Sequence, residues 1–128
     1  MAKKLAIVFG IVFVLVGLLG FVSNPIIGMN TDAIFLTDAI HNIVHLLIGV
    51  VLLIAGSKSE GAAASAMKLF GIVYLVLFLN GLVTPDQLLG FVTQNQNDTW
   101  LHLILGIVLL IAGFTARGND MRVDNATM

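Results

Sequence analysis

The chain of 128 residues contains no cysteine and few charged residues. The absence of cysteine excludes disulfides, iron–sulfur clusters and a thiol nucleophile. Charged residues make up 10% of the sequence, whereas soluble domains carry about 25%. The net charge of −1 excludes the basic face that nucleic acid binding needs, so we expect no nucleic acid partner.

Apolar residues are abundant instead, and 59% of the chain is hydrophobic. They form four windows with the length that a helix needs to cross a bilayer, roughly 17–25 residues. The sequence therefore predicts an all-α fold, a bundle of four transmembrane helices in contact with the lipid bilayer. The windows cover about 5–22, 39–56, 62–83 and 99–116.

The second and fourth windows have nearly the same sequence. Residues 45–56 align with residues 102–113: each segment begins with histidine, carries glycine four residues later and ends in Ile-Ala-Gly. We therefore predict two tandem helical-hairpin repeats, residues 5–56 and 66–113.

The first and third windows match as well, because residues 9–13 align with residues 70–74.

Each half contains an even number of spans, so both hairpins should have the same topology. An axis along the membrane normal should then relate them. Together they form a predicted membrane domain of residues 1–116, followed by a polar tail, 117–128.

The basic residues predict the orientation of this domain. All of them fall on one side of the four windows, and the two loops on the other side carry only acidic charges. Because positive charge favours the cytoplasmic side, we expect a multi-pass inner-membrane protein with both termini in the cytoplasm. The basic residues are Lys3, Lys4, Lys58, Lys68, Arg117 and Arg122.

The two outer loops should be irregular. Pro25 and Pro85 follow the first and third windows, and proline cannot continue a helix. The apolar segment 34–36 is too short to cross the bilayer. It should lie on the membrane surface or pack over the bundle.

Polar side chains gather in the outer third of the predicted bundle. His41 and His45 are four residues apart and share one face of the second helix. The repeat places Asp98 and His102 at the equivalent positions of the fourth helix. Asn42 and Asn80 should lie at a similar depth, as supporting polar residues.

These residues suggest several kinds of site. His41, His45, His102 and Asp98 are suitable ligands for zinc or a similar divalent ion. Alternatively, His45 and His102 could hold haem b, since each has a glycine one turn deeper. A proton or solute path along His41, Asp98 and Asn80 is a third hypothesis.

A structural interpretation competes with all three. In this interpretation the histidines lie at helix ends close to water and pair with Asp98 or with loop carbonyls. They then keep the two hairpins in register. Gly49 and Gly106 would then let helix backbones approach closely.

The histidine segments resemble a known family. Residues 41–46, His-Asn-Ile-Val-His-Leu, precede Gly49, and residues 100–103, Trp-Leu-His-Leu, precede Gly106. This pattern resembles that of a bacterial four-span membrane family catalogued as a domain of unknown function. The resemblance implies a small bacterial inner-membrane protein and brings no activity with it.

The chain contains no glycine-rich phosphate loop and no Gly-x-Ser-x-Gly motif, so no enzymatic activity is indicated. We expect a non-enzymatic structural or accessory membrane subunit that associates with itself or with a larger membrane complex. The alternative is a metal- or haem-binding membrane protein that uses the outer histidines.

Overall fold

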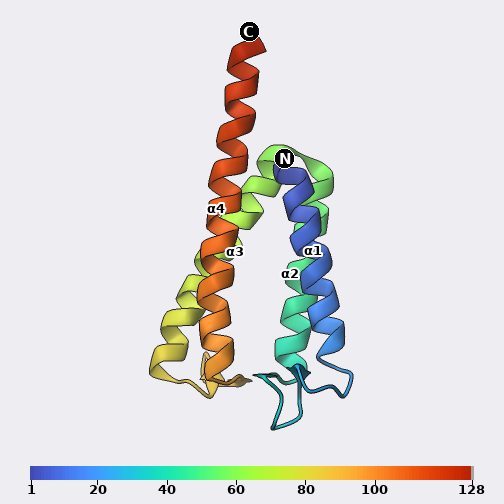
Figure 1. The fold of residues 1–128 in the computed structure, drawn as a ribbon, viewed down its shortest axis with the longest axis vertical. Helices are drawn as coiled ribbons and strands as arrows, with labels where there is room; N and C mark the ends of the chain where they lie inside the picture. The colour runs from blue at the N-terminus through green and yellow to red at the C-terminus, as the bar shows by residue number, and fades with distance from the viewer. Residues whose placement is uncertain (128) are drawn as a thin grey trace.

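The computed structural model describes residues 1–127, and their side chains as far as residue 116. Four long helices form two hairpins, with two very small sheets at one end (Figure 1). Each helix is long and apolar enough to cross a membrane, so the predicted all-α four-span fold is confirmed. The helices are α1 (Ala2–Leu19), α2 (Ala39–Lys58), α3 (Glu60–Val83) and α4 (Gln96–Thr127).

Helix α1 ends at Leu19, earlier than the apolar window does. Asn24 explains the difference, because its side chain organises the turn that follows. Its amide group donates to the carbonyl of Leu19, and its Oδ1 accepts from the N–H groups of Ile26 and Ile27. These bonds satisfy backbone groups that the helix end leaves free.

Helices α2 and α3 begin at side-chain caps. The Asp38 carboxylate accepts from the N–H of His41, and the Ser59 hydroxyl accepts from the N–H of Ala62. Ser59 is extended and is the single residue between the two helices. Glu60, the next residue, accepts from the backbone N–H of Lys3 and so ties the start of α1 to this connection.

Helix α4 continues to Thr127. The segment 117–127, which the sequence predicts as a separate polar tail, is therefore helical as far as the structure describes it. Its side chains lie outside the described residues.

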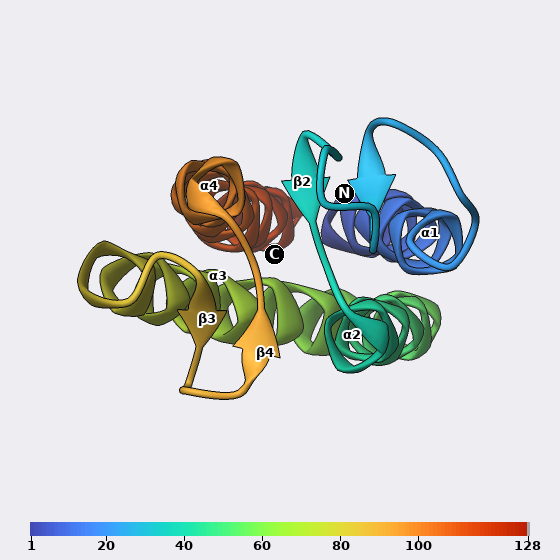
Figure 2. The same ribbon diagram turned by 90° about the horizontal axis from the view of Figure 1, so that it is seen from below.

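Each outer loop contains a two-stranded sheet that the sequence analysis does not predict. Strand β1 (Ile27–Gly28) pairs in parallel with β2 (Phe35–Leu36), and β3 (Gln87–Leu88) pairs antiparallel with β4 (Val92–Thr93). Leu89 and Gly90 have φ of 54° and 83°, the left-handed values that tight hairpin turns require. Seen from the outer end, β2 and β4 cross over the bundle (Figure 2).

Glycines bring the two helices of each hairpin into backbone contact. A Cβ on Gly10 would lie 2.9 Å from the carbonyl oxygen of Gly49, and one on Gly71 would lie 3.1 Å from that of Gly106. These distances leave no room for a side chain. The residues that align in the two halves of the sequence thus make corresponding contacts, α1 with α2 and α3 with α4.

The core runs along the seam between the two hairpins. Near the helix ends that include the N-terminus, the core consists of small residues: Ala2, Ala6, Ala63 and Ala64 are fully buried. Larger side chains fill it farther out, namely Phe13, Ile48, Leu52, Met67, Tyr74 and Leu109. The outward faces are apolar, with Leu15, Ile54, Leu79 and Ile111 about 60% exposed, as expected of helices that contact lipid.

Substituting alanine for Gly49 should test the helix contact. The new Cβ would meet the Gly10 carbonyl oxygen at 2.8 Å and the Val14 nitrogen at the same distance. Overpacking of this kind costs about 1–3 kcal/mol. Thermal unfolding in detergent should therefore show a lower Tm for Gly49→Ala.

Gly61→Ala is the matched control, because nothing lies within 4 Å of a Cβ at Gly61. Its Tm should stay the same or rise slightly, since alanine favours a helix more than glycine does. Equal Tm values for Gly49→Ala and the wild type would contradict the close contact.

Candidate functional site

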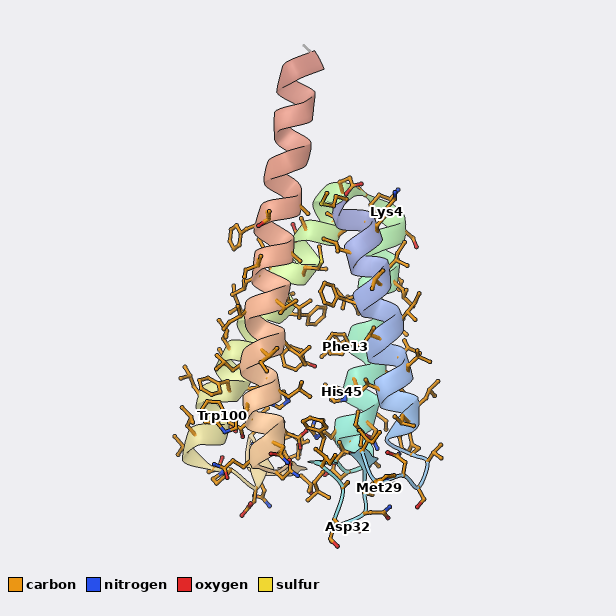
Figure 3. All side chains as sticks on the ribbon, in the orientation of Figure 1. Lys4, Phe13, Met29, Asp32, His45 and Trp100 are labelled. Atoms are coloured by element: carbon orange, nitrogen blue, oxygen red, sulfur yellow. The ribbon has the colours of Figure 1, made fainter. Side chains whose placement is uncertain are left out.

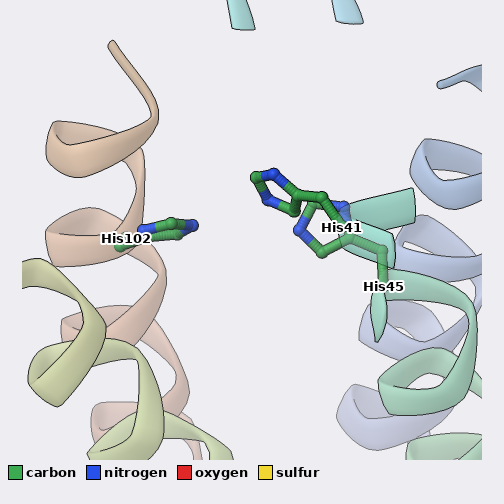
Figure 4. Close-up of side chains that lie close together, drawn as sticks. All are labelled: His41, His45 and His102. Carbon is green, nitrogen blue, oxygen red and sulfur yellow. The ribbon is translucent and has the colours of Figure 1, made fainter. Parts of the chain in front are cut away.

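Three histidines from two helices come together near the end of the bundle that carries the two small sheets. His41 and His45 extend from the first turns of α2, and His102 extends from α4 toward them (Figure 4). One ring nitrogen from each residue lies within 4.8 Å of the others. The residues are only 2%, 6% and 1% exposed, so the group is a buried polar cluster in an apolar seam.

Helical periodicity places these side chains. His41 and His45 stand on the face of α2 that continues through Ile48, Gly49 and Leu52, all of which are buried. Because this face packs into the seam between the hairpins, both imidazoles point away from lipid. Figure 3 shows His45 and Phe13 directed into the same interior space.

Three of the six ring nitrogens are buried and lack a hydrogen-bond partner among the described residues. They are Nε2 of His41 and Nδ1 of both His45 and His102. Folded proteins satisfy nearly all buried polar groups, so three such atoms together need an explanation. A ligand or metal ion that uses the free ring nitrogens would provide one.

The remaining nitrogen of His41 fixes the tautomer of that ring. Its Nδ1 lies 2.8 Å from the carbonyl oxygen of Thr93 in β4. A carbonyl only accepts hydrogen bonds, so Nδ1 carries the proton and Nε2 has a free lone pair. This is the arrangement that orients histidine ligands in metal sites.

Asp38 holds Thr93 and His41 together. One carboxylate oxygen accepts from the N–H of His41 at 2.8 Å, and the other accepts from the N–H of Thr93 at 2.9 Å. Asp38 and His41 belong to the first hairpin, whereas Thr93 belongs to the second. These bonds therefore join the two hairpins at the loop end of the bundle, next to the histidines.

The carboxylate of Asp98 is hydrogen-bonded within its own helix start. It accepts from the N–H of Asn95 at 3.0 Å, and the backbone N–H of Asp98 donates to the Asn95 side chain at 3.1 Å. This reciprocal pair caps the start of α4. The structure therefore gives Asp98 a capping role, and it is not among the clustered ligands.

Asn42 and Asn80 also contact other parts of the chain. Asn42 is fully buried and packs against Gly20, where any side chain would collide with it. Asn80 accepts from the N–H of Leu89 and so holds the turn between β3 and β4. The two supporting asparagines thus position the outer loops and the first hairpin.

Comparison with known proteins identifies the family. The family model described as "Domain of unknown function (DUF4383)" matches residues 3–115. The chain belongs to this family. No curated protein and no solved structure matches it.

In this DUF4383 member, aromatic rings complete the surroundings of the histidines. The ring of Tyr74 lies 5.3 Å from that of His102, and the ring of Phe13 lies 6.0 Å from that of His45. Tyr74 is assigned no role in the sequence analysis. Its alignment with Phe13 in the other repeat is the signal that could have placed both beside the histidines.

The hydrogen bonds of Asp38 predict a dependence of stability on pH. Burial raises the pKa of this carboxyl, but hydrogen bonds from Thr93 and His41 outweigh burial, and the pKa is below its ordinary value. The carboxylate therefore stabilises the fold above the unfolded pKa of about 3.9. That contribution disappears as the pH falls through the folded value.

We expect Asp38→Asn to lower stability at neutral pH by an amount of order 1 kcal/mol, because the amide nitrogen cannot accept from Thr93. The difference from the wild type should begin to shrink as the pH falls below the unfolded pKa of about 3.9, and it should vanish once the pH has fallen through the lower folded pKa. Thermal unfolding in detergent across this range measures it. Asp32→Asn removes an exposed carboxylate from the same loop and should change nothing. A pH-independent difference for Asp38→Asn would refute the prediction.

Proposed function

We propose that this protein binds one divalent transition metal ion, zinc or an ion of similar preference, through His41, His45 and His102. The observation that carries the proposal is the convergence of three ring nitrogens from two hairpins within 4.8 Å. Imidazole is a favourable ligand for zinc, copper, iron and nickel. The burial of all three rings argues against an accidental surface cluster.

The distances agree with a site that tightens on binding. Tetrahedral zinc with bonds of about 2.0–2.1 Å to nitrogen places its ligand nitrogens roughly 3.3 Å apart. The separations of up to 4.8 Å therefore need to close by roughly 1.5 Å at most. Since His102 is on α4 and the other two are on α2, the ion would link the two hairpins.

Three histidines leave the fourth zinc position open, as in zinc sites that bind water or another oxygen ligand. Asp98 is absent from the proposed ligand set because its carboxylate already caps α4. The hydrogen bond from His41 Nδ1 to Thr93 supports the proposal, because it leaves Nε2 free to coordinate.

Two alternatives from the sequence fit the geometry less well. Haem b between His45 and His102 requires a flat space there, yet the ring of His41 lies 4.7 Å from His45 and 6.1 Å from His102. A purely structural clamp requires partners for the histidines, and among the described residues only His41 Nδ1 bonds a loop carbonyl. An accessory, non-enzymatic role remains compatible with metal binding.

We also propose an inner-membrane location with both termini in the cytoplasm. Lys4 lies at the end of the bundle opposite to Met29 and Asp32 (Figure 3). Lys3, Lys58 and Lys68 likewise belong to the helix ends away from the small sheets. The positive-inside tendency supports this orientation, which places the histidines near the outer surface. The protein is also proposed to associate with itself or with a larger membrane complex.

The metal proposal predicts that purified protein retains about one zinc ion per chain after dialysis. Substituting alanine for any of the three histidines should abolish retention, because two imidazoles cannot hold the ion. Zinc at about 100 times its Kd should stabilise the wild type by about 2.7 kcal/mol and the variants by much less. Elemental analysis and thermal unfolding with added zinc measure these effects.

Asp98→Asn is the matched control, since the asparagine Oδ1 can still accept from the N–H of Asn95 and Asp98 is not a proposed ligand. It should retain zinc like the wild type. Equal loss in Asp98→Asn and His45→Ala would show that the ligand set is wrong. A wild type that neither retains zinc nor responds to it would refute metal binding.

A further inference from the structure

A small cavity of about 180 Å³ adjoins the histidines between α2 and α3. His41, His45, His102 and Tyr74 line it, and all four residues are buried. Apolar residues line the rest. The imidazole and phenol rings thus border a space whose surface is almost entirely apolar.

The cavity opens toward the bilayer. Val44 of α2 and Val73 of α3 line it and are 39% and 36% exposed on the faces of spanning helices. Three residues of the β3–β4 hairpin also line it: Leu88 and Val92 are only 4% and 6% exposed, whereas Leu89 at the turn is 62% exposed. Because this hairpin is bonded to α2 through Thr93, it covers the histidines on the outer side. A ligand would therefore enter from lipid.

The size of the cavity suits a single ring. A protein cavity of about 150 Å³ holds benzene. The volume of about 180 Å³ leaves space for a six-membered ring with small substituents. A tail attached to that ring would leave between Val44 and Val73 into the hydrocarbon region.

The polar groups beside the cavity determine which substituents a bound ring can carry. Among the described side chains, the lysines belong to the opposite helix ends, so no ammonium group compensates a carboxylate or phosphate here. Nε2 of His41 has a free lone pair and can accept a hydrogen bond from a quinol hydroxyl. Nδ1 of His45 or His102 has no partner among the described residues and, in the tautomer that protonates it, can donate to a quinone carbonyl. Neutral ring oxygens therefore fit better than an anionic head.

We propose that this cavity binds the head ring of a lipid-soluble quinone or quinol. The proposal goes beyond metal binding and does not require it. Without metal, the ring oxygens bond the imidazoles directly. With zinc bound, the open fourth position is available to a ring oxygen.

The test is calorimetric titration of the full chain in detergent with a decyl-substituted benzoquinone. The wild type should bind one molecule per chain. Val73→Trp and Val44→Trp narrow the cavity from α3 and from α2 and should weaken binding about tenfold or more. Neither residue is a proposed metal ligand, so zinc retention should remain unchanged. Helical circular dichroism and gel filtration establish which variants are folded.

Val12→Trp is the matched control, because Val12 aligns with Val73 in the other repeat. It lines another cavity, of about 330 Å³ between α1 and α4, which reaches His45 but neither His41 nor His102. This variant should bind the quinone like the wild type. A wild type that does not bind, folded Val73→Trp and Val44→Trp proteins with undiminished affinity, or weakened binding in Val12→Trp alone would each overturn the assignment. Quinone binding by protein that retains no zinc would support the cavity and refute only the metal.

Discussion

Backbone contact between glycines is the constraint on which the rest of the structure depends. Gly10 against Gly49, and Gly71 against Gly106, close each hairpin so tightly that a Cβ at any of these positions would approach partner atoms within about 3 Å. Each hairpin is thus a compact unit, and the two units share a single seam. Small alanines fill that seam near the N-terminus, while aromatic rings and histidines fill it toward the outer loops.

Placing three imidazoles in this seam is costly unless they bind something. Polar groups inside a membrane span usually face a partner or a functional site. Here Asp38 and Thr93 orient His41 from the loop side, whereas His45 Nδ1 and His102 Nδ1 have no partner among the described residues. A bound ion would provide a partner for the histidine ring nitrogens that protein contacts alone leave unsatisfied. Under the quinone proposal, the same seam would also give lipid-soluble molecules access to the histidines.

Sequence reasoning was most informative where periodicity decides the structure. The four apolar windows predicted the four helices, and the i, i+4 spacing placed His41 and His45 on one buried face. The repeat suggested that His102 lies at the same depth. It was misleading for Asp98, which aligns with His41 but pairs with Asn95, because local capping bonds outweigh an alignment. The bond from His41 to Thr93 could not be read from the sequence, since it depends on how two irregular loops fold over the bundle.

The central claim is that His41, His45 and His102 coordinate one metal ion together. X-ray absorption spectroscopy of the zinc-loaded protein measures the coordination shell directly. The account predicts three imidazole nitrogens at about 2.0–2.1 Å and one further light ligand. A shell that consists of oxygen, with fewer than two imidazoles, would contradict it.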